Sequence, residues 1–316
     1  MMLARTGSSL YWTGRYIERV EHLARYVNAQ HLSFSDAPRA LDKRLGLESM
    51  LAMANAAQDF EAKQLDYTEE QVLFFLTISE ENPFSIRNYL STIRENARGI
   101  RDNISTELWE TINRFYHTTN EFAAEDLKRK GPYDFCKHML NFVNIIKGVA
   151  DNTMLRNESW AMMRVGINLE RSIQINHILL TKLEDIGKID KNELSTAVSG
   201  YHWASLLRSA GGFDMSRHYY HESPNRKRGI EFLILNQKFP KSVLFNLKEV
   251  YNHLNNISRQ NGLKPESVEF TAGKLIAHME YLTVDNIMDE GEAFLYKLNE
   301  QLFDIGNQLE KQYLQH

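Results

Sequence analysis

The sequence predicts an all-α protein, and three observations support this fold class. Proline is rare, at 6 of 316 residues, and proline disrupts a helix interior because it removes a backbone donor and clashes with the preceding turn. Apolar residues recur three and four positions apart in one segment after another, which is the helical period. Alternation of apolar and polar residues, which is typical of a strand, never persists. With 43% apolar and 25% charged residues, the composition is that of a globular protein.

The first predicted helix covers residues 8–30 and has two distinct faces. Ser8 or Ser9 is a suitable N-cap, because a serine hydroxyl accepts a hydrogen bond from a free backbone N–H of the first turn. At 100° per residue, one face is apolar and the other is charged. The apolar face carries Tyr16, Ile17, Val20, Leu23, Ala24 and Val27, and the charged face carries Arg15, Glu18, Arg19, Glu21, His22 and Arg25.

The remaining helices follow from the same periodicity and from turn signals. Asn82-Pro83 marks a turn before one helix, with proline near its first turn. Lys128-Arg129-Lys130-Gly131-Pro132 places cations, then glycine and proline, at the end of another. The segment 211–229, with Gly211-Gly212 and several aromatic residues, predicts an exposed aromatic loop. Helices are expected at 45–62, 68–79, 84–103, 104–128, from Phe135 through Ile146, and at 154–185, 192–209, 240–258, 266–281 and 284–313.

Part of the first helix recurs later in the chain. Gly14-Arg15-Tyr16-Ile17-Glu18-Arg19 is matched 152 positions later by Gly166-Ile167-Asn168-Leu169-Glu170-Arg171. Asn82-Pro83-Phe84-Ser85-Ile86 is similarly matched by Phe239-Pro240-Lys241-Ser242-Val243. Two motifs in the same order at a similar offset favour a duplicated helical unit, although Glu-Arg pairs also arise on helices by chance. We predict a large helical bundle of two related halves, 1–130 and 131–316, packed as one unit.

These motifs resemble the bacterial alpha-E family. The opening segment from Ser9 to Arg19 is similar to the opening motif of that family, and the segment from Asn82 to Glu110 is similar to its central signature. One departure is Ile167, where the second copy of the motif would repeat an arginine. The resemblance implies a helical architecture and an unassigned molecular function. Family members tend to be encoded beside ATP-grasp ligases and transglutaminase-like proteins, which implies a peptide-forming or peptide-modifying system.

Four arginines form a line on the predicted helix 84–103. They fall within an arc of about 60° at the helical period. Like charges three or four positions apart repel by roughly 0.2–0.5 kcal/mol per pair, so acidic partners are expected. These acidic partners are either internal, with Glu18, Glu21 or Glu170 as the first candidates, or belong to a ligand or partner protein. As a third alternative, the four arginines simply form a solvated face of the helix. We call the four residues the arginine stripe: Arg87, Arg94, Arg98 and Arg101.

The charged face of the first helix allows two interpretations. It is either a solvated or interhelical salt-bridge face, or a polar pocket between the two related helices. Gly14 and Gly166 cost helix stability of about 1 kcal/mol each, so we expect a close approach of another helix or a ligand at both. The candidate anion- or partner-binding residues are therefore Arg15, Glu18, Arg19, Arg87, Arg94, Arg98, Arg101, Glu170 and Arg171.

The sequence contains no recognised motif for a catalytic residue, a metal site or a cofactor. No pair of Glu-x-x-His motifs is present for a di-iron site, and His218-Tyr219-Tyr220-His221-Glu222 follows neither zinc-protease order. Cys136 lies among apolar neighbours and is expected in the core. No phosphate-binding loop, nucleophile elbow or dinucleotide fingerprint occurs. Metal and cofactor are therefore both predicted to be absent.

Charge and hydropathy narrow the partners and the compartment. A net charge of −4 gives no electrostatic reason to expect nucleic acid. No apolar run reaches the ~18 residues of a membrane span, and the first residues lack the pattern of a signal peptide. A single cysteine cannot form an internal disulfide, which favours a reducing compartment. We therefore expect a cytoplasmic protein with no nucleic-acid and no membrane partner.

Three functional hypotheses follow. The first is a non-enzymatic helical accessory or binding protein, acting with an ATP-grasp-type ligase or transglutaminase-like system on an acidic or peptide-like ligand. The second is a metal-independent enzyme whose pocket lies between the duplicated helices, with Glu18 or Glu170 as acid/base and arginines as carboxylate clamps. The third is a structural oligomer built through the long C-terminal helix.

Overall fold

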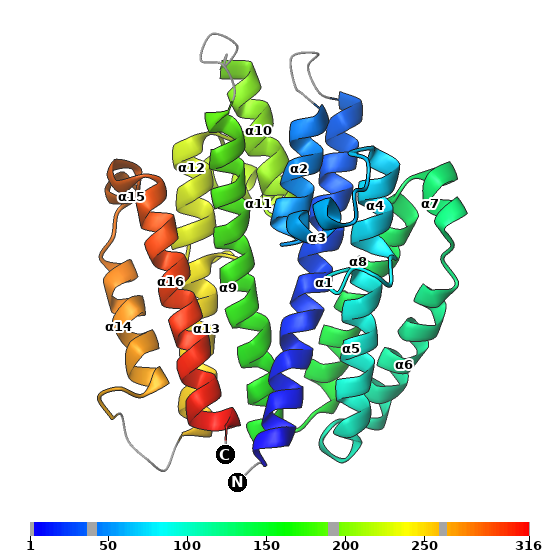
Figure 1. The fold of residues 1–316 in the computed structure, drawn as a ribbon. Coiled ribbons are helices and arrows are strands. Elements are labelled where there is room, and N and C mark those ends of the chain that lie inside the picture. The colour runs from blue at the N-terminus through cyan, green and yellow to red at the C-terminus, as the bar shows by residue number, and fades with distance from the viewer. Residues whose placement is uncertain (1–2, 37–42, 189–195, 259–263, 316) are drawn as a thin grey trace.

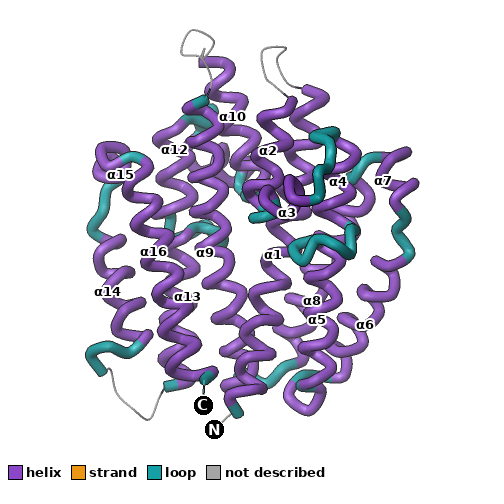
Figure 2. The backbone as a smooth tube through the Cα atoms, viewed as in Figure 1, coloured by secondary structure: helices purple, strands orange, loops and turns teal. Residues whose placement is uncertain are grey.

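The computed structural model describes residues 3–36, 43–188, 196–258 and 264–315. Within these ranges the chain consists of helices, turns and loops, and Figure 2 shows no strand among them. The predicted all-α fold class is confirmed. The α-helices are α1 (Ala4–Asp36), α2 (Lys43–Met53), α3 (Ala57–Ala62), α4 (Glu69–Thr77), α5 (Ile86–Gly99), α6 (Thr106–Asn120), α7 (Ala124–Lys130), α8 (Tyr133–Thr153), α9 (Glu158–Gly187), α10 (Thr196–Ser209), α11 (Phe213–Tyr220), α12 (Arg226–Ile230), α13 (Val243–Ile257), α14 (Val268–Glu280), α15 (Val284–Glu290) and α16 (Glu292–Leu309).

The two longest helices, α1 and α9, lie side by side at the centre of the molecule (Figure 1). Helices α5 and α8 flank α1, and α13 and α16 flank α9, with the long axes of all six nearly aligned (Figure 1). The two ends of the chain lie close together at one end of this bundle. Because α9 lies at the centre, its buried residues occur around the whole helix, and they include polar residues such as Glu170 and Arg171 as well as apolar ones.

The two sides of the bundle have matching neighbours. On one side, α1 packs on α5 and α8, and α6 packs on both α5 and α8. On the other side, α9 packs on α13 and α16, and α14 packs on both α13 and α16. The helices α5 and α13 also begin alike, since Ser85 and Ser242 each accept a hydrogen bond from the backbone N–H three residues later. Each central helix therefore belongs to a group of four helices with the same order along the chain.

Two glycines allow α1 and α9 to cross closely. A Cβ on Gly14 would stand 2.2 Å from the carbonyl oxygen of Met163, and one on Gly166 would stand 2.1 Å from the carbonyl oxygen of Tyr11. Real Cβ atoms do not approach backbone oxygen this closely, so only glycine fits at either position. The structure accounts in this way for the two glycines that the sequence places inside helices.

Several predicted helices are interrupted by local backbone features. The predicted helix 45–62 is divided into α2 and α3, with Asn55 at a φ of 53° between them. The predicted helix 284–313 is divided at Gly291, whose φ is 63°. The predicted helix 104–128 is divided into α6 and α7, and 84–103 ends as an α-helix at Gly99. The predicted helix 192–209 starts outside the described residues and is helical from Thr196.

The prediction of a loop at 211–229 is wrong. Helix α11 occupies Phe213–Tyr220 and ends at His221, whose φ of 55° is left-handed; α12 starts after Asn225, which caps it. The eight residues of α11 are too few for an apolar period to show in the sequence. Contacts of Tyr219 and Tyr220 with Phe232 hold this segment against the rest of the protein. Tertiary packing therefore outweighs the loop-like composition.

Candidate functional site between the two central helices

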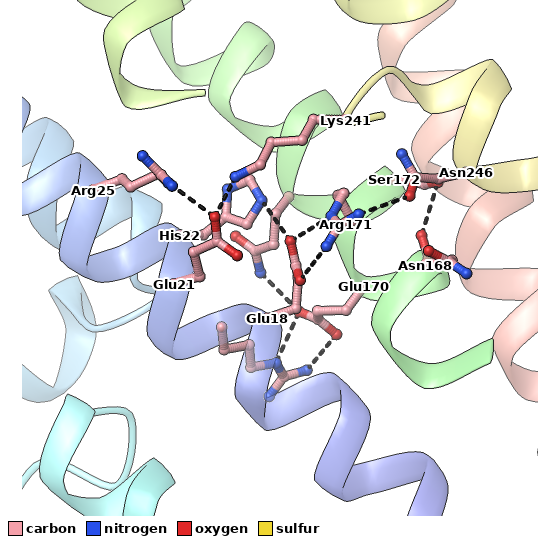
Figure 3. Close-up of polar contacts among 12 residues, drawn as sticks. Glu18, Glu21, His22, Arg25, Asn168, Glu170, Arg171, Ser172, Lys241 and Asn246 are labelled. Carbon is pink, nitrogen blue, oxygen red and sulfur yellow. Dashed lines mark hydrogen bonds and ion pairs between the residues drawn. The ribbon is translucent and has the colours of Figure 1, made fainter. Parts of the chain in front are cut away.

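The Glu-Arg motifs of α1 and α9 pair with each other across the helix crossing (Figure 3). Arg171 donates to both oxygens of Glu18, with Nε–Oε1 at 2.6 Å and Nη2–Oε2 at 2.9 Å. Arg19 donates to both oxygens of Glu170, with Nε–Oε1 at 2.8 Å and Nη2–Oε2 at 3.4 Å. Each motif thus supplies the acid for the arginine of the other motif. The forked guanidinium suits a carboxylate because it presents two parallel N–H groups.

Further cations surround both carboxylates. Arg15 donates to Glu170 and to the hydroxyl of Tyr11. On the other side, Lys147 of α8 lies 2.6 Å from an oxygen of Glu18. The fourth residue after each glutamate also faces it, since Gln174 Nε2 donates to Glu170 at 2.8 Å and His22 Nε2 lies 3.5 Å from Glu18. The two glutamates are consequently held in nearly equivalent polar surroundings.

A third carboxylate extends the network along α1. Glu21 accepts from Arg25 at 2.9 Å and from Lys147 at 2.6 Å, and it also pairs with Lys241, which precedes α13. Figure 3 shows Arg25 and Lys241 reaching Glu21 from different elements. The network therefore joins helices from both sides of the bundle.

The neighbouring cations decide the protonation of these acids. Burial by itself raises the pKa of Glu170, but the charges of Arg15 and Arg19 outweigh burial and lower the pKa to about 2. The pKa of Glu18 is likewise held well below its ordinary value, because Arg171 and Lys147 outweigh its burial. Both groups are thus ionised near neutral pH and act as hydrogen-bond acceptors. A general acid or base would need a pKa much nearer the working pH.

A cavity of about 360 Å³ opens beside Glu170. Arg15 and Arg19 line it, and so do Tyr89 of α5, Gln174 and His177 of α9 and Asn299 of α16. Burial lowers the pKa of His177, so its imidazole is neutral at pH 7. The described residues that line the cavity therefore carry two guanidinium charges and one carboxylate charge. Such a cavity can accept one negative charge together with groups that hydrogen-bond to carboxamides.

The arginine stripe does not reach this network, so the prediction that Glu18, Glu21 or Glu170 are its partners is wrong. Arg87 donates to the carbonyl of Phe122 at 2.7 Å, and Arg94 donates to Asn113 and Glu95, both at 2.8 Å. The reason is the orientation of α5, which packs on α1 through apolar residues, including Ile86, Leu90 and Ile93, and turns its arginines away from α1.

The end of the stripe also differs from the prediction. Arg98 lies 3.4 Å from Glu95 on the surface. Arg101 lies outside α5, in a short 3₁₀ turn (Arg101–Asn103), with its guanidinium 4.0 Å from the ring centre of Trp109. The sequence-predicted site residues therefore divide into a group that the fold brings together and a group that it keeps apart. The first group is Arg15, Glu18, Arg19, Glu170 and Arg171, and the second is Arg87, Arg94, Arg98 and Arg101.

Sequence reasoning missed several residues of the network. Lys241 lies in the Phe239-Pro240-Lys241-Ser242 segment, which matches an earlier motif of the chain. That match drew attention to the segment but did not predict the contact of Lys241 with Glu21. Lys147 and Asn299 carry no sequence signal, because they approach from α8 and α16. Tyr89 lies beside Arg19, whose guanidinium carbon is 5.8 Å from its ring centre.

Other reactive groups lie apart from this site. Cys136 is buried, and burial raises the pKa of its thiol. Within the described ranges, no group of three or more histidine, cysteine, aspartate or glutamate side chains is arranged to hold a metal ion. His218 and His221 are exposed at the end of α11, whereas His202 is buried in α10. None of the helices described is long and apolar enough to cross a bilayer.

The fold and its central feature define a class: helical proteins in which two long helices are joined by reciprocal Glu-Arg pairs. The family model Alpha-E, described as a predicted alpha-helical domain with a conserved ER motif, matches residues 2–314. The chain therefore belongs to the Alpha-E family. Glu18-Arg19 and Glu170-Arg171 are Glu-Arg sequences of the kind that this description names.

Curated relatives share part of the chain. It is 23% identical over 207 residues to uncharacterised proteins of Mycobacterium bovis and Mycobacterium tuberculosis. The match covers 58% of this chain and 22% of each relative, so the chain spans about a fifth of the length of the curated relatives it matches. No solved structure matches the chain.

Proposed function

We propose that this protein is a non-enzymatic binding protein that holds an acidic or peptide-like ligand in the cavity beside Glu170. The observation that carries the proposal is the charge imbalance of the described lining, with Arg15 and Arg19 facing one carboxylate. A carboxylate of the ligand would contact the guanidinium of Arg19, whose side chain is 23% exposed. Gln174 and Asn299 offer donors and acceptors for peptide groups.

The alternative of a metal-independent enzyme has less support. That hypothesis requires Glu18 or Glu170 to exchange a proton with substrate, and it is favoured by a carboxylate without a cationic partner. Each of the two instead contacts at least two cations, which hold its pKa low. The same pairing supports a structural role for the Glu-Arg motifs, with binding left to the cavity at their edge.

We further propose that the protein acts together with a second protein. About four fifths of each curated relative lies outside the matched region, which supports a physical association between this helical unit and other protein segments. The resemblance to the alpha-E family favours an ATP-grasp-type peptide ligase as this partner. The proposed compartment is the cytoplasm, on the basis of the single cysteine. A purified ligase of this type that neither binds the protein nor responds to it would remove this part of the proposal.

We also propose that the chain contains two related units. The reciprocal ion pairs support this, because the glutamate of each central helix pairs with the arginine of the other. The matching neighbours of α1 and α9 support it as well. The boundary between residues 130 and 131 stays a prediction. The packing of α8 on α1 and α6 favours counting α8 with the first unit.

Isothermal titration calorimetry tests the ligand proposal. The probes are a glutamate-containing dipeptide and the same dipeptide with its carboxylates amidated. We expect saturable binding of the acidic form only, and a loss of affinity of about tenfold or more in Arg19→Gln, because a charge-assisted hydrogen bond is removed. The matched control is Arg98→Gln, an exposed arginine of the same type away from the cavity.

A second variant covers the case in which Arg19→Gln is unstable. Asn299→Ala changes the cavity wall and leaves the ion pairs of Glu170 intact, so it should weaken binding of the acidic dipeptide without unfolding the protein. Equal binding of the acidic and amidated probes, or an equal loss in Arg98→Gln, would overturn the proposal.

A further inference from the structure

A second pocket, of about 410 Å³, lies between α1, α8 and α10. It uses a different face of α1 from the cavity at Glu170, since Arg25, Asn28 and Ser33 line it in place of Arg15 and Arg19. Leu140 of α8 and Tyr201 of α10 form other parts of the wall. None of the described residues that line this pocket is acidic, whereas two of them, Arg25 and Arg208, are arginines.

The two arginines present free N–H groups to the pocket. Arg208 is exposed, makes no ion pair with any residue of the described ranges, and rests its guanidinium 4.6 Å from the ring centre of Phe213. Arg25 donates its Nε to Glu21 at 2.9 Å, and its two terminal nitrogens make no hydrogen bond to a described residue. Two planar guanidinium groups, each with N–H groups that make no hydrogen bond to a described residue, therefore line the same pocket.

The charge network behind Arg25 is also unbalanced. Glu18 and Glu21 contribute two negative charges. Four cations pair with one or both of them: Arg25, Lys147, Arg171 and Lys241. Burial lowers the pKa of Lys241 to about 8 although Glu21 favours its charged form. An excess of positive charge at partly buried positions costs free energy, and an anion bound nearby offsets that cost.

We propose that this pocket binds the phosphoryl group of a small phosphate monoester. A phosphate monoester is close to doubly negative near neutral pH, and its oxygens accept hydrogen bonds from two guanidinium forks at once. Its charge matches Arg25 and Arg208 together, and the remaining volume holds the organic part of the ligand. The inference is independent of the cavity at Glu170.

Titration calorimetry of the full chain with inorganic phosphate, glycerol phosphate and succinate tests the proposal. We expect saturable binding of both phosphates at one site per chain, and weaker binding of succinate. Arg208→Gln should weaken phosphate binding by about tenfold or more, since a charged donor pair is lost. The matched control is Arg217→Gln, because Arg217 is also exposed and lies 5.6 Å from the same Phe213 ring but does not line the pocket.

A second variant adds a charge without a change of size. Asn28→Asp places a carboxylate in the pocket, so it should abolish phosphate binding by repulsion, and circular dichroism would show whether the fold is retained. Asn299→Ala, which leaves the ion pairs of Glu170 intact, should leave phosphate binding unchanged, which separates this site from the proposed carboxylate cavity. Absence of saturable phosphate binding in the wild type, an equal loss in Arg217→Gln, or succinate binding as tight as phosphate would each overturn the assignment.

Discussion

Arginines dominate two regions of this protein, the α1–α9 crossing and the stripe on α5, and they behave differently in each. At the crossing, the side chains of Arg15 and Arg171 are 6% and 10% exposed and pair with glutamates of the opposite helix. On α5, Arg98 is 61% exposed, and the acid that it approaches, Glu95, lies on its own helix. The two sets of arginines therefore differ in burial and in whether the acidic partner lies on another helix or on the same helix.

The comparison indicates what each set contributes. A buried pair between helices fixes how the helices sit against each other, because either charge left alone in the interior is strongly unfavourable. A surface pair on one helix is screened by water and contributes little. The stripe instead gains from ring contacts, such as Arg101 over Trp109 and Arg94 over Tyr116. Arginine occurs in both regions, and its burial and its partners determine what it contributes.

The largest expected effect comes from removing a buried carboxylate. Glu18→Gln leaves Arg171 and Lys147 without their shared counter-charge in the interior, so we expect the free energy of unfolding to fall by about 3–5 kcal/mol. Urea denaturation at pH 7 measures it. The matched control is Glu95→Gln, which removes a 52% exposed acid that pairs with Arg94 of the stripe and should cost less than about 1 kcal/mol. Similar small losses for both variants would contradict the distinction between the regions.

Acid should weaken the crossing over a defined pH range. The pKa of Glu170 is lowered from 4.5 to about 2 in the folded protein, so the folded state binds this proton less tightly than the unfolded state. Its contribution is complete above about pH 4.5 and is lost as the pH falls toward 2, amounting to about 3 kcal/mol. Urea denaturation across this range should show a shallower pH dependence for Glu170→Gln than for the wild type. Equal slopes would count against the depressed pKa.

The close helix approach can be tested through glycine. In Gly14→Ala the new methyl group meets the carbonyl of Met163, and we expect a loss of about 1–3 kcal/mol despite the better helix propensity of alanine. Gly148→Ala in α8 is the matched control, since no atom stands within 4 Å of its Cβ position. That variant should be more stable than the wild type by up to about 1 kcal/mol. Melting temperatures that move in the same direction would refute the close crossing.

The smallest effects are expected within the stripe itself. Arg94→Ala loses the bond to Asn113 and the contact with Tyr116, which should cost about 1 kcal/mol. Arg98→Ala loses one exposed pair and should change stability by less than about 0.5 kcal/mol. Chemical denaturation of both variants sharpens the comparison inside one helix. A larger loss for Arg98→Ala would reveal a role for the stripe that its contacts do not explain.

Local pattern was sufficient for the fold class and for most of the helices, and it singled out the Glu-Arg motifs. The apolar period of residues 8–30 and the scarcity of proline depend only on neighbours along the chain, so α1 and the fold class were predictable. Gly14 and Gly166 were recognisable because glycine is unfavourable inside a helix unless something approaches closely. Breaks at Asn55 and Gly291 were missed, since a left-handed residue inside a periodic segment leaves the period intact.

The tertiary structure was needed to determine which charged residues pair with each other. Glu170 pairs with Arg19 of α1 and not with Arg94 of α5. The reason is that α5 buries its apolar face, which includes Ile86, Leu90 and Ile93, and this orientation keeps Arg94 away from Glu170. Lys147 and Lys241 join the network from segments more than a hundred residues away from Glu18 and Glu21. Long-range pairing of this kind follows from how whole helix faces pack, and no short stretch of sequence encodes it. The local helical period is a property of the chain, whereas the assembly of these charges is a property of the fold.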